Sequence, residues 1–345
     1  MRRLAVVGAG AIGLYTAYEA LKRGYEVDIY EASTSITRSP SARMPGLIVP
    51  IERPFSSFKN KLVMKGYKRH LKLSSELGYD IRFTRLILPY KRRILDHLMW
   101  IPRIYMKRYG IDIKILRGEK LFNRYPELNR LFIGGVEIHG FGIVDPPGII
   151  ISLERGVKEL GGGIYLGYKV HPITPEKVIN GVEYDHIVVA AGPHTREVVR
   201  NVITPPRQRF GKGIYAITSI YLDYIINHFT VTGWRYTRGY GYAPYYKGVG
   251  SIFGATFSWT PAKEDYMLDY ELIREAIRRA PTLLREEPDI LSVHSLPRVV
   301  NYPSNRWIIK VRDGVAATFG ITTPGFTAAP AIAEYILDRF NMMDR

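Results

Sequence analysis

The stretch Leu4-Ala5-Val6-Val7-Gly8-Ala9-Gly10-Ala11-Ile12-Gly13 decides the fold of this 345-residue chain. Its four apolar residues predict a short buried strand, and the six residues that follow fit the pattern G-x-G-x-x-G. Apolar residues at helical spacing come next, and Gly24 stands where a helix ends. A second strand is expected over 27–30. This order of strand, turn, helix and strand is typical of a dinucleotide-binding unit.

The glycines of this turn each have a physical role in binding a nucleotide. Gly8 allows a tight turn, Gly10 lets the backbone approach a pyrophosphate, and Gly13 lets helix and strand pack closely. The helix begins near Ala11 and Ile12, and its N-terminus presents free N–H groups to the phosphates. The turn therefore predicts a bound dinucleotide.

Glu31 and Ala32 end the second strand and are predicted to contact the cofactor. Glu31 lies eighteen residues after Gly13, where a carboxylate accepts hydrogen bonds from a ribose hydroxyl. Its negative charge also argues against the 2′-phosphate of NADP. The turn does not by itself choose between NAD and FAD. It is the one such turn in the sequence, whereas a flavoenzyme that also binds NAD(P)H usually needs two.

The composition excludes several kinds of chemistry. The chain has no cysteine, which excludes disulfides, thiolate metal sites and a cysteine nucleophile. The eight histidines are scattered without metal-ligand spacing, so we expect no metal. The sequence has no run of eighteen apolar residues and no signal segment, which favours a cytoplasmic protein.

The charge is strongly basic, with 49 Lys and Arg against 32 Asp and Glu and a net charge of +17. These residues are spread along the chain, which favours a solvated basic surface. Peripheral contact with an anionic membrane is the alternative, and no nucleic acid partner is expected.

Periodicity predicts the other elements. Helices are expected over 56–79, 143–160, 264–280 and 327–340, and a long loop over 33–50. Strands are expected over 164–166, 187–192, 307–311 and 315–319, with an antiparallel sheet over 209–260. Strand–helix alternation at both ends, with antiparallel sheet between them, implies two interleaved domains, one of them discontinuous.

Five segments together resemble one enzyme family. They are residues 4–31, the loop Ser41–Ile48, Val144-Asp145-Pro146, the strand and turn Val188–Pro193, and the closing segment Gly320–Pro330. In this order they resemble the D-amino acid oxidase-like family of FAD-dependent oxidoreductases, which includes glycine oxidase and sarcosine oxidase. The resemblance implies an α/β fold with a Rossmann-like FAD-binding domain (1–80, 141–208 and 296–345). A second domain with a mixed antiparallel sheet (81–140 and 209–295) would hold the substrate.

The resemblance also implies which residues hold FAD. They are Ser41, Ala42, Arg43, Pro45, Gly46 and Leu47 in the flavin-side loop, Val170 beside the adenine, Ala191 and Gly192 after a strand, and Gly320, Thr322, Thr323, Pro324, Gly325, Phe326 and Thr327 in the closing motif. Thr327 would cap the last helix, with Pro330 in its first turn. The N–H groups of residues 325–327 would stabilise negative charge on reduced flavin. No His lies in the 41–50 loop and no Cys exists, so noncovalent FAD is expected.

The substrate residues are harder to assign. An Arg binds a carboxylate through two parallel hydrogen bonds, and Arg298 precedes the closing motif where the family has its carboxylate-binding Arg. Arg306 is its rival. Four tyrosines (Tyr240, Tyr242, Tyr245 and Tyr246) cluster on the expected sheet, and Tyr242 is the one named for the substrate pocket.

The resemblance implies oxidation of an amino acid or secondary amine by hydride transfer to flavin N5, with oxygen or another electron acceptor. Three alternatives stay open. The first is a dehydrogenase of the same fold that passes electrons to a quinone or carrier. The second is an oxidoreductase acting on a 2-hydroxy acid or glycerol phosphate. The third is a non-redox protein with structural FAD, with RNA as a partner for its basic surface.

Overall fold

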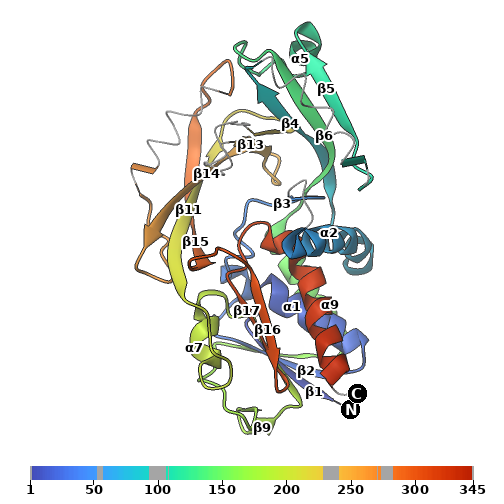
Figure 1. The fold of residues 1–345 in the computed structure, drawn as a ribbon, viewed down its shortest axis with the longest axis vertical. Coiled ribbons are helices and arrows are strands. Elements are labelled where there is room, and N and C mark those ends of the chain that lie inside the picture. The colour runs from blue at the N-terminus through green and yellow to red at the C-terminus, as the bar shows by residue number, and fades with distance from the viewer. Residues whose placement is uncertain are drawn as a thin grey trace.

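The computed structural model describes residues 2–52, 57–92, 106–107, 109–227, 241–269, 271–272 and 283–343. They form two sheets and a group of helices (Figure 1). The helices are α1 (Ala11–Lys22), α2 (Phe58–Leu77), α5 (Glu119–Arg124), α6 (Pro146–Glu159), α7 (Thr195–Val199) and α9 (Gly325–Met343), with 3-10 turns η1 (Ile36–Arg38) and η2 (Gly192–His194).

The first sheet has six strands in the order β16-β17-β10-β1-β2-β7. The strands are β1 (Arg3–Val7), β2 (Glu26–Glu31), β7 (Gly163–Leu166), β10 (His186–Val189), β16 (Ile308–Arg312) and β17 (Val315–Phe319). All pairs are parallel except β16 with β17. Such a parallel sheet needs cover on both faces.

Alternate residues of β1 point into two different hydrophobic cores, one on each face of the sheet. Leu4 and Val6 belong to the cluster formed with α1, α6 and α9. Ala5 and Val7 point the other way, into a cluster that includes Val199 of α7. Burial on both faces explains why β1 is a continuous apolar run.

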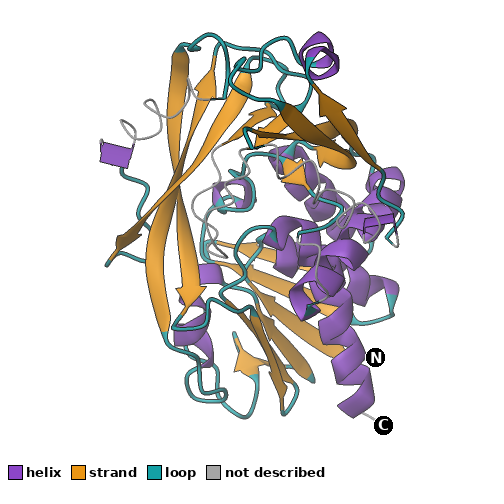
Figure 2. Ribbon diagram, turned by 45° about the horizontal axis from the view of Figure 1, so that its top comes forward, coloured by secondary structure: helices purple, strands orange, loops and turns teal. Residues whose placement is uncertain are grey.

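The second sheet has nine strands in the order β15-β11-β14-β13-β12-β4-β6-β3, and β5 also pairs with β6. They are β3 (Leu47–Ile48), β4 (Arg82–Tyr90), β5 (Ile113–Arg117), β6 (Gly134–Ile143), β11 (Gln208–Thr218), β12 (Ile225–Asn227), β13 (Gly241–Pro244), β14 (Ser251–Thr260) and β15 (Ile290–Asn301). Figure 2 shows this larger sheet curving over the group of helices. A separate hairpin joins β8 (Val178–Ile179) and β9 (Val182–Glu183).

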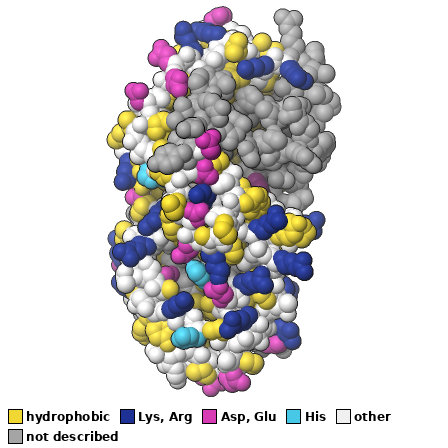
Figure 3. Space-filling view, turned by 90° about the vertical axis from the view of Figure 1, so that its left-hand side faces the viewer, with side chains coloured by type: hydrophobic (Ala, Val, Ile, Leu, Met, Phe, Trp, Pro, Cys, Tyr) yellow, Lys and Arg dark blue, Asp and Glu magenta, His cyan; other side chains and the backbone are white. Residues whose placement is uncertain are grey.

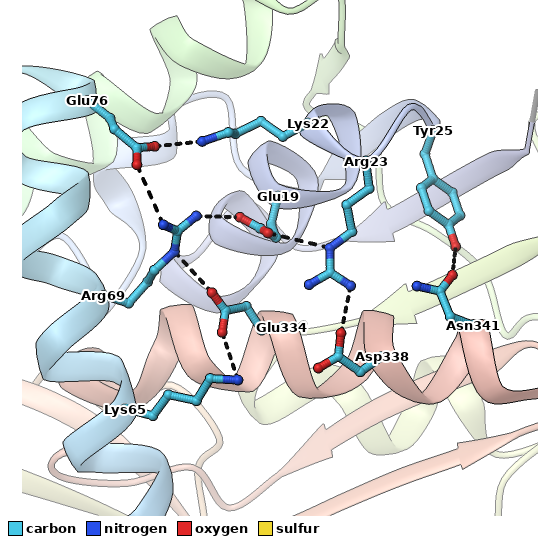
Figure 4. A network of polar contacts seen from close by, with 10 residues as sticks. All are labelled: Glu19, Lys22, Arg23, Tyr25, Lys65, Arg69, Glu76, Glu334, Asp338 and Asn341. Carbon is cyan, nitrogen blue, oxygen red and sulfur yellow. Dashed lines mark hydrogen bonds and ion pairs between the residues drawn. The ribbon is translucent and has the colours of Figure 1, made fainter.

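Helices α1, α2 and α9 are joined on their polar sides by a network of ion pairs (Figure 4). Arg69 of α2 lies 2.8 Å from Glu19 of α1 and 3.0 Å from Glu334 of α9. Arg23 of α1 lies 2.8 Å from Asp338 of α9. These three helices are therefore linked by charge as well as by apolar packing.

The predicted α/β fold with two sheets is confirmed. Helix α9 is longer than expected and begins at Gly325. Thr327 therefore lies within its first turn and does not cap it, and Pro330 lies inside the helix beyond the first turn. The expected loop at 33–50 contains η1 and β3. The expected helix over 264–280 is wrong for 264–269, which form no helix, and most of its remainder lies outside the described residues.

The predicted domain boundaries at 141 and 296 fall inside β6 and β15. Both strands belong to the second sheet, and so does β3. The division into a cofactor domain and a substrate domain stays a prediction, but its boundaries would have to move to the ends of these strands.

Candidate functional site

The Gly8–Gly13 turn joins β1 to α1 and leaves no room for a side chain at Gly8 or Gly13. Gly8 has a φ of +103°, and a Cβ there would lie 2.7 Å from the Ala190 carbonyl oxygen. A Cβ on Gly13 would lie 1.8 Å from the carbonyl oxygen of Gly8. Gly10 is extended, and α1 begins at Ala11 directly after it. The first N–H groups of α1, including that of Ile12, therefore follow a bare backbone turn, as a phosphate site requires.

Glu31 reaches back from the end of β2 to this turn. Its carboxylate accepts hydrogen bonds from the backbone N–H of Ala9 at 2.7 Å and of Ser33 at 2.8 Å. Ala32 is exposed beside it. The carboxylate thus lies at the mouth of the glycine turn, where the sequence places the ribose.

Two further predicted segments border the turn. The N–H of Ala190 donates to the Val7 carbonyl at 2.9 Å, which puts Ala191 and Gly192 directly beside the turn. The N–H of Tyr168 donates to the Glu31 carbonyl at 2.9 Å, which carries the segment of Val170 along the end of β2. The structure therefore brings these two parts of the chain to the turn.

The flavin-side loop packs against the start of α1. The Ser41 hydroxyl accepts a hydrogen bond from the N–H of Ala11 at 3.1 Å, and Ala42 is buried. After Pro45, the loop passes Val144, which donates its N–H to the Gly46 carbonyl at 2.9 Å. Leu47 then enters the second sheet as part of β3. This loop connects the glycine turn to the larger sheet.

The closing motif meets the same region from the C-terminal side. The Thr327 hydroxyl accepts a hydrogen bond from the N–H of Val49 at 3.3 Å, so α9 begins next to the end of β3. Lys59 donates to the Thr323 carbonyl at 3.0 Å. The other predicted members, Gly320, Thr322, Pro324, Gly325 and Phe326, lie in this loop or in the first turn of α9.

Arg298 lies on β15 and points over the neighbouring strand β11. A Cβ on Gly213 would lie 3.0 Å from Arg298 Nε and 3.2 Å from its Cζ. Burial lowers the pKa of the Arg298 guanidinium from its ordinary value. Among the residues that the structure describes, this guanidinium has no hydrogen bond and no ion pair. A half-buried cation without a carboxylate partner is a natural binding point for an anion.

Strand register places Arg298 on the same face as a residue that touches the flavin-side loop. Arg298 pairs with Gly211, and His294 pairs with Tyr215, so these side chains lie on one face. The Tyr215 hydroxyl donates to the Arg43 carbonyl at 3.0 Å. Arg298 therefore faces the side of the sheet that meets the predicted cofactor loop.

Tyr215 and His294 were not named from the sequence. Their rings stack with centroids 5.0 Å apart and an interplanar angle of 15°. Burial, together with Lys247, lowers the pKa of His294. The sequence signal for Tyr215 is its spacing of two residues from Gly213 and four from Gly211. This spacing places all three on one face of a strand, the face on which Arg298 lies on the neighbouring strand.

The structure places Tyr242 differently from the pocket residue we expected. It is fully buried, and its ring lies 4.9 Å from that of Phe253 in an apolar cluster with Ile87 and Tyr125. Ala243, the next residue of β13, lies on the other face of the strand, in the cluster that includes Leu47 of the flavin-side loop. Tyr242 points away from that loop, which favours a packing role over contact with substrate.

The remaining substrate candidates are the other three tyrosines of the predicted cluster and Arg306. Tyr240 lies outside the described residues. Tyr245 and Tyr246 form an edge-to-face pair, with Tyr246 against Gly46. Arg306 is exposed.

Comparison with known proteins identifies the family. The family model described as FAD dependent oxidoreductase matches residues 3–339. The chain belongs to this family of FAD-dependent oxidoreductases. No curated protein sequence matches it significantly.

Solved structures share the fold at low sequence identity. L-α-glycerophosphate oxidase from Mycoplasma pneumoniae, with FAD bound, has a TM-score of 0.84 and 19% identity, covering 99% of this chain and 95% of that one. Glycine oxidase from Geobacillus kaustophilus has a TM-score of 0.78 and 19% identity, covering 98% and 95%. L-proline dehydrogenase from P. horikoshii has a TM-score of 0.79 and 18% identity, covering 98% and 93%.

The cofactor of the family, FAD, fits the residues present here. The bare glycine turn and the carboxylate of Glu31 beside it lie near the N-terminus of the sequence, and the start of α9, which lies beside the flavin-side loop, comes from its C-terminal part. Within the described ranges, no group of three or more His, Asp or Glu side chains is arranged to hold a metal.

Over the described residues of the face seen in Figure 3, the surface shows no concentration of one charge. Lys and Arg side chains there alternate with acidic and hydrophobic ones. None of the helices in the described residues has the length and apolar character needed to cross a membrane. Contact with an anionic membrane stays a prediction.

Proposed function

We propose that this oxidoreductase acts on an amino acid or a secondary amine that carries a carboxylate, and that Arg298 binds this carboxylate. The observation that supports the proposal is the environment of Arg298. Its guanidinium lies over Gly213 without an ion-pair partner among the described residues, on the sheet face that Tyr215 shares. A bound carboxylate would compensate its buried charge.

The cofactor would be held by residues from both ends of the chain. The N–H groups at the start of α1 would meet the pyrophosphate, and Glu31 would accept hydrogen bonds from the ribose. The first N–H groups of α9 would lie toward the pyrimidine side of the ring system, where a helix N-terminus stabilises negative charge. Bound FAD supplies a hydride acceptor at N5. With no cysteine and no histidine in the 41–50 loop, its attachment would be noncovalent.

The protein side chains would orient the substrate. Arg298 would fix the carboxylate by two parallel hydrogen bonds, which leaves the Cα–H one direction to face the flavin. The neutral Tyr215–His294 ring pair would lie next to Arg298 on the same face of the sheet and would form the neighbouring part of the substrate site. Burial raises the pKa of Tyr215 to about 12, so its hydroxyl stays protonated and bound to the Arg43 carbonyl.

The alternatives differ in the substrate and in the electron acceptor. A glycerol phosphate or 2-hydroxy acid would also present an anion to Arg298, and electrons could pass to a quinone or carrier instead of oxygen. Solved structures of a glycerophosphate oxidase and of a proline dehydrogenase share this fold. The fold alone therefore does not distinguish these substrates or electron acceptors.

The deciding experiment is anaerobic bleaching of the bound flavin. The panel contains D- and L-amino acids, N-methyl amino acids, 2-hydroxy acids and glycerol phosphate. We expect an amino or N-methyl amino acid to bleach the flavin fastest. Bleaching by glycerol phosphate or a hydroxy acid alone would replace the amine proposal, and no bleaching by any member would contradict it. Oxygen consumption against dye reduction then identifies the acceptor.

A further inference from the structure

The first turn of α9 contains a carbonyl that its own helix does not satisfy. In an α-helix the N–H of residue 330 would donate to the carbonyl of Phe326. Residue 330 is proline, buried inside α9, and it has no N–H. The Phe326 carbonyl therefore needs a donor from elsewhere in the molecule.

His70 of α2 supplies that donor. Its Nε2 lies 3.1 Å from the Phe326 carbonyl oxygen, and the two rings stack with centroids 5.7 Å apart and an interplanar angle of 17°. His70 is completely buried. The contact joins residues 256 positions apart in the sequence.

The partners of His70 fix its protonation state. A carbonyl oxygen only accepts, so Nε2 carries the hydrogen. Nδ1 lies 3.2 Å from the hydroxyls of both Tyr15 and Tyr79, and a hydroxyl can donate to it. Burial lowers the pKa of His70 to about 4. His70 is thus a neutral imidazole with one defined tautomer.

The turn that His70 holds is the one that carries the predicted flavin contacts. Thr327 in this turn also accepts the N–H of Val49, at the end of the strand that follows the flavin-side loop. Without its donor, the Phe326 carbonyl would be buried unpaired, and the first turn would rearrange to reach water or another donor.

We propose that His70 is a positioning residue that replaces the hydrogen bond lost at Pro330 and so holds the first turn of α9 in the geometry that receives FAD. The inference rests on the proposed function, in that FAD is placed against this turn. His70 itself acts only through the Phe326 carbonyl.

The test measures the Kd of FAD for the apoprotein in two His70 variants. In His70→Leu we expect FAD to bind about tenfold more weakly, because binding must first order the turn. His70→Gln keeps an N–H donor at a similar reach and should recover part of the affinity. Hydrogen exchange of the N–H groups of residues 328–329 in the apoprotein should be faster in His70→Leu than in the parent.

A rescue separates positioning from general stability. Pro330→Ala gives residue 330 an N–H that can reach the Phe326 carbonyl. In this background His70→Leu should change the Kd of FAD by less than about threefold. A full loss of affinity in the double variant would overturn the proposal.

His186 provides the matched control. It is also buried and stacks on a phenylalanine of α9, Phe340, with centroids 4.3 Å apart, but at the other end of the helix. His186→Leu should lower thermal stability and leave the Kd of FAD unchanged. Unchanged FAD affinity and exchange in His70→Leu would show a purely structural role. A parent protein that does not bind FAD would instead contradict the proposed function.

Discussion

The guanidinium of Arg298 lies directly above the backbone of Gly213, and a Cβ at that glycine would approach Arg298 Nε to 3.0 Å. The two residues are on adjacent antiparallel strands, and Gly213 lies two residues beyond Gly211, the partner of Arg298. The side chain thus leans along the sheet toward Tyr215. The position of the Arg298 charge therefore depends on the absence of a side chain at Gly213 as much as on the arginine itself.

Gly213→Ala should displace this guanidinium and weaken substrate binding. The contact is tighter than ordinary packing, so the arginine has to shift by a few tenths of an ångström. We expect kcat/KM for the best substrate of the panel to fall about three- to tenfold, because small misplacements of a binding group are costly. Flavin content should not change.

Gly254→Ala is the matched control for this variant. It lies on the adjacent strand β14, and its Cβ would meet Tyr215 at 3.4 Å, an ordinary contact. It should leave kcat/KM within about twofold. Equal effects of the two variants would show that any added methyl group in this sheet disturbs the site, independent of Arg298.

Arg298→Ala should remove about 2–5 kcal/mol of substrate binding, because the carboxylate loses its partner. Arg298→Lys should recover only part of it, since an ammonium cannot pair bidentately. The measurement compares anaerobic flavin reduction by the best substrate acid with reduction by its amide. The parent should prefer the acid, and Arg298→Ala should not. If the variant keeps both the rate and the preference, the carboxylate binds elsewhere, with Arg306 or the Tyr245–Tyr246 pair as the next candidates.

The nucleotide-binding half of the fold was predictable because its decisive contacts are local. The turn at Gly8–Gly13 and the strand, helix and strand around it lie within 31 residues, and each glycine has a steric reason visible in the sequence. Arg298 itself was named from its position before the closing motif, but no strand was predicted over 290–301. Its alignment over Gly213 depends on long-range strand register, which the sequence does not show.

The substrate side was predicted less well. Alternation of polar and apolar residues indicates that a segment is a strand, but it does not indicate which face of that strand lies toward the cofactor. Tyr242 and Ala243 are neighbours on β13, and the buried tyrosine points into the apolar cluster on the opposite face. Pro330 was expected in the first turn of the last helix. The contact of His70 with Phe326 lets the helix start earlier and contain the proline.

Glu31→Ala should weaken FAD binding by about 1–3 kcal/mol, the range for a lost hydrogen bond to a charged group. The carboxylate also holds the N–H groups of Ala9 and Ser33, so the turn itself loosens. Titration of apoprotein with FAD gives the Kd. Glu26→Ala, at an exposed position of the same strand, is the control and should bind FAD normally. Equal affinity in both variants would place the ribose away from Glu31.

Gly13→Val should abolish FAD binding, because its Cβ would overlap the Gly8 carbonyl oxygen. Helix α1 would have to move away from β1, which opens the turn. The apoprotein should still show the helical circular dichroism of the parent, at a lower melting temperature. A folded variant that binds FAD with the Kd of the parent would show that the nucleotide does not use this turn.

Protonation of His70 should lower the stability of the fold in mild acid. Its folded pKa is about 4, whereas the unfolded value is near 6.5, so the unfolded chain takes up the proton first. The stabilisation is fully present above about pH 6.5 and decreases as the pH falls toward 4, by about 3 kcal/mol in total. Urea unfolding at pH 7.5 and 4.5 should show a larger loss in the parent than in His70→Gln. An equal loss would mean that His70 titrates normally in the fold.

Arg69→Met should destabilise the fold by about 1–3 kcal/mol, because it removes the cation shared by three carboxylates. Arg69 contacts Glu19, Glu76 and Glu334, and only 18% of its side chain is exposed. Among the described residues, the three carboxylates left behind keep only Arg23, Lys22 and Lys65 as ion-pair partners. Their like charges on three helices then repel one another in a partly desolvated space. Burial opposes the charged form of Arg69, but the hydrogen bond to Glu19 and the charges of Glu19, Glu76 and Glu334 raise its pKa overall.

Salt distinguishes this charge effect from lost packing. Repulsion among the three carboxylates is screened at high ionic strength, so the difference between Arg69→Met and the parent should shrink from 0.05 to about 1 M NaCl. Lys158→Met breaks an exposed pair with Glu154, in which 59% of the lysine side chain is exposed, and should cost less than about 0.5 kcal/mol at either salt concentration. Urea unfolding of the three proteins at both concentrations is the measurement. If the cost of Arg69→Met does not change with salt, the alkyl chain of Arg69 and its packing between α1, α2 and α9 carry the stabilisation, and the ion pairs do not.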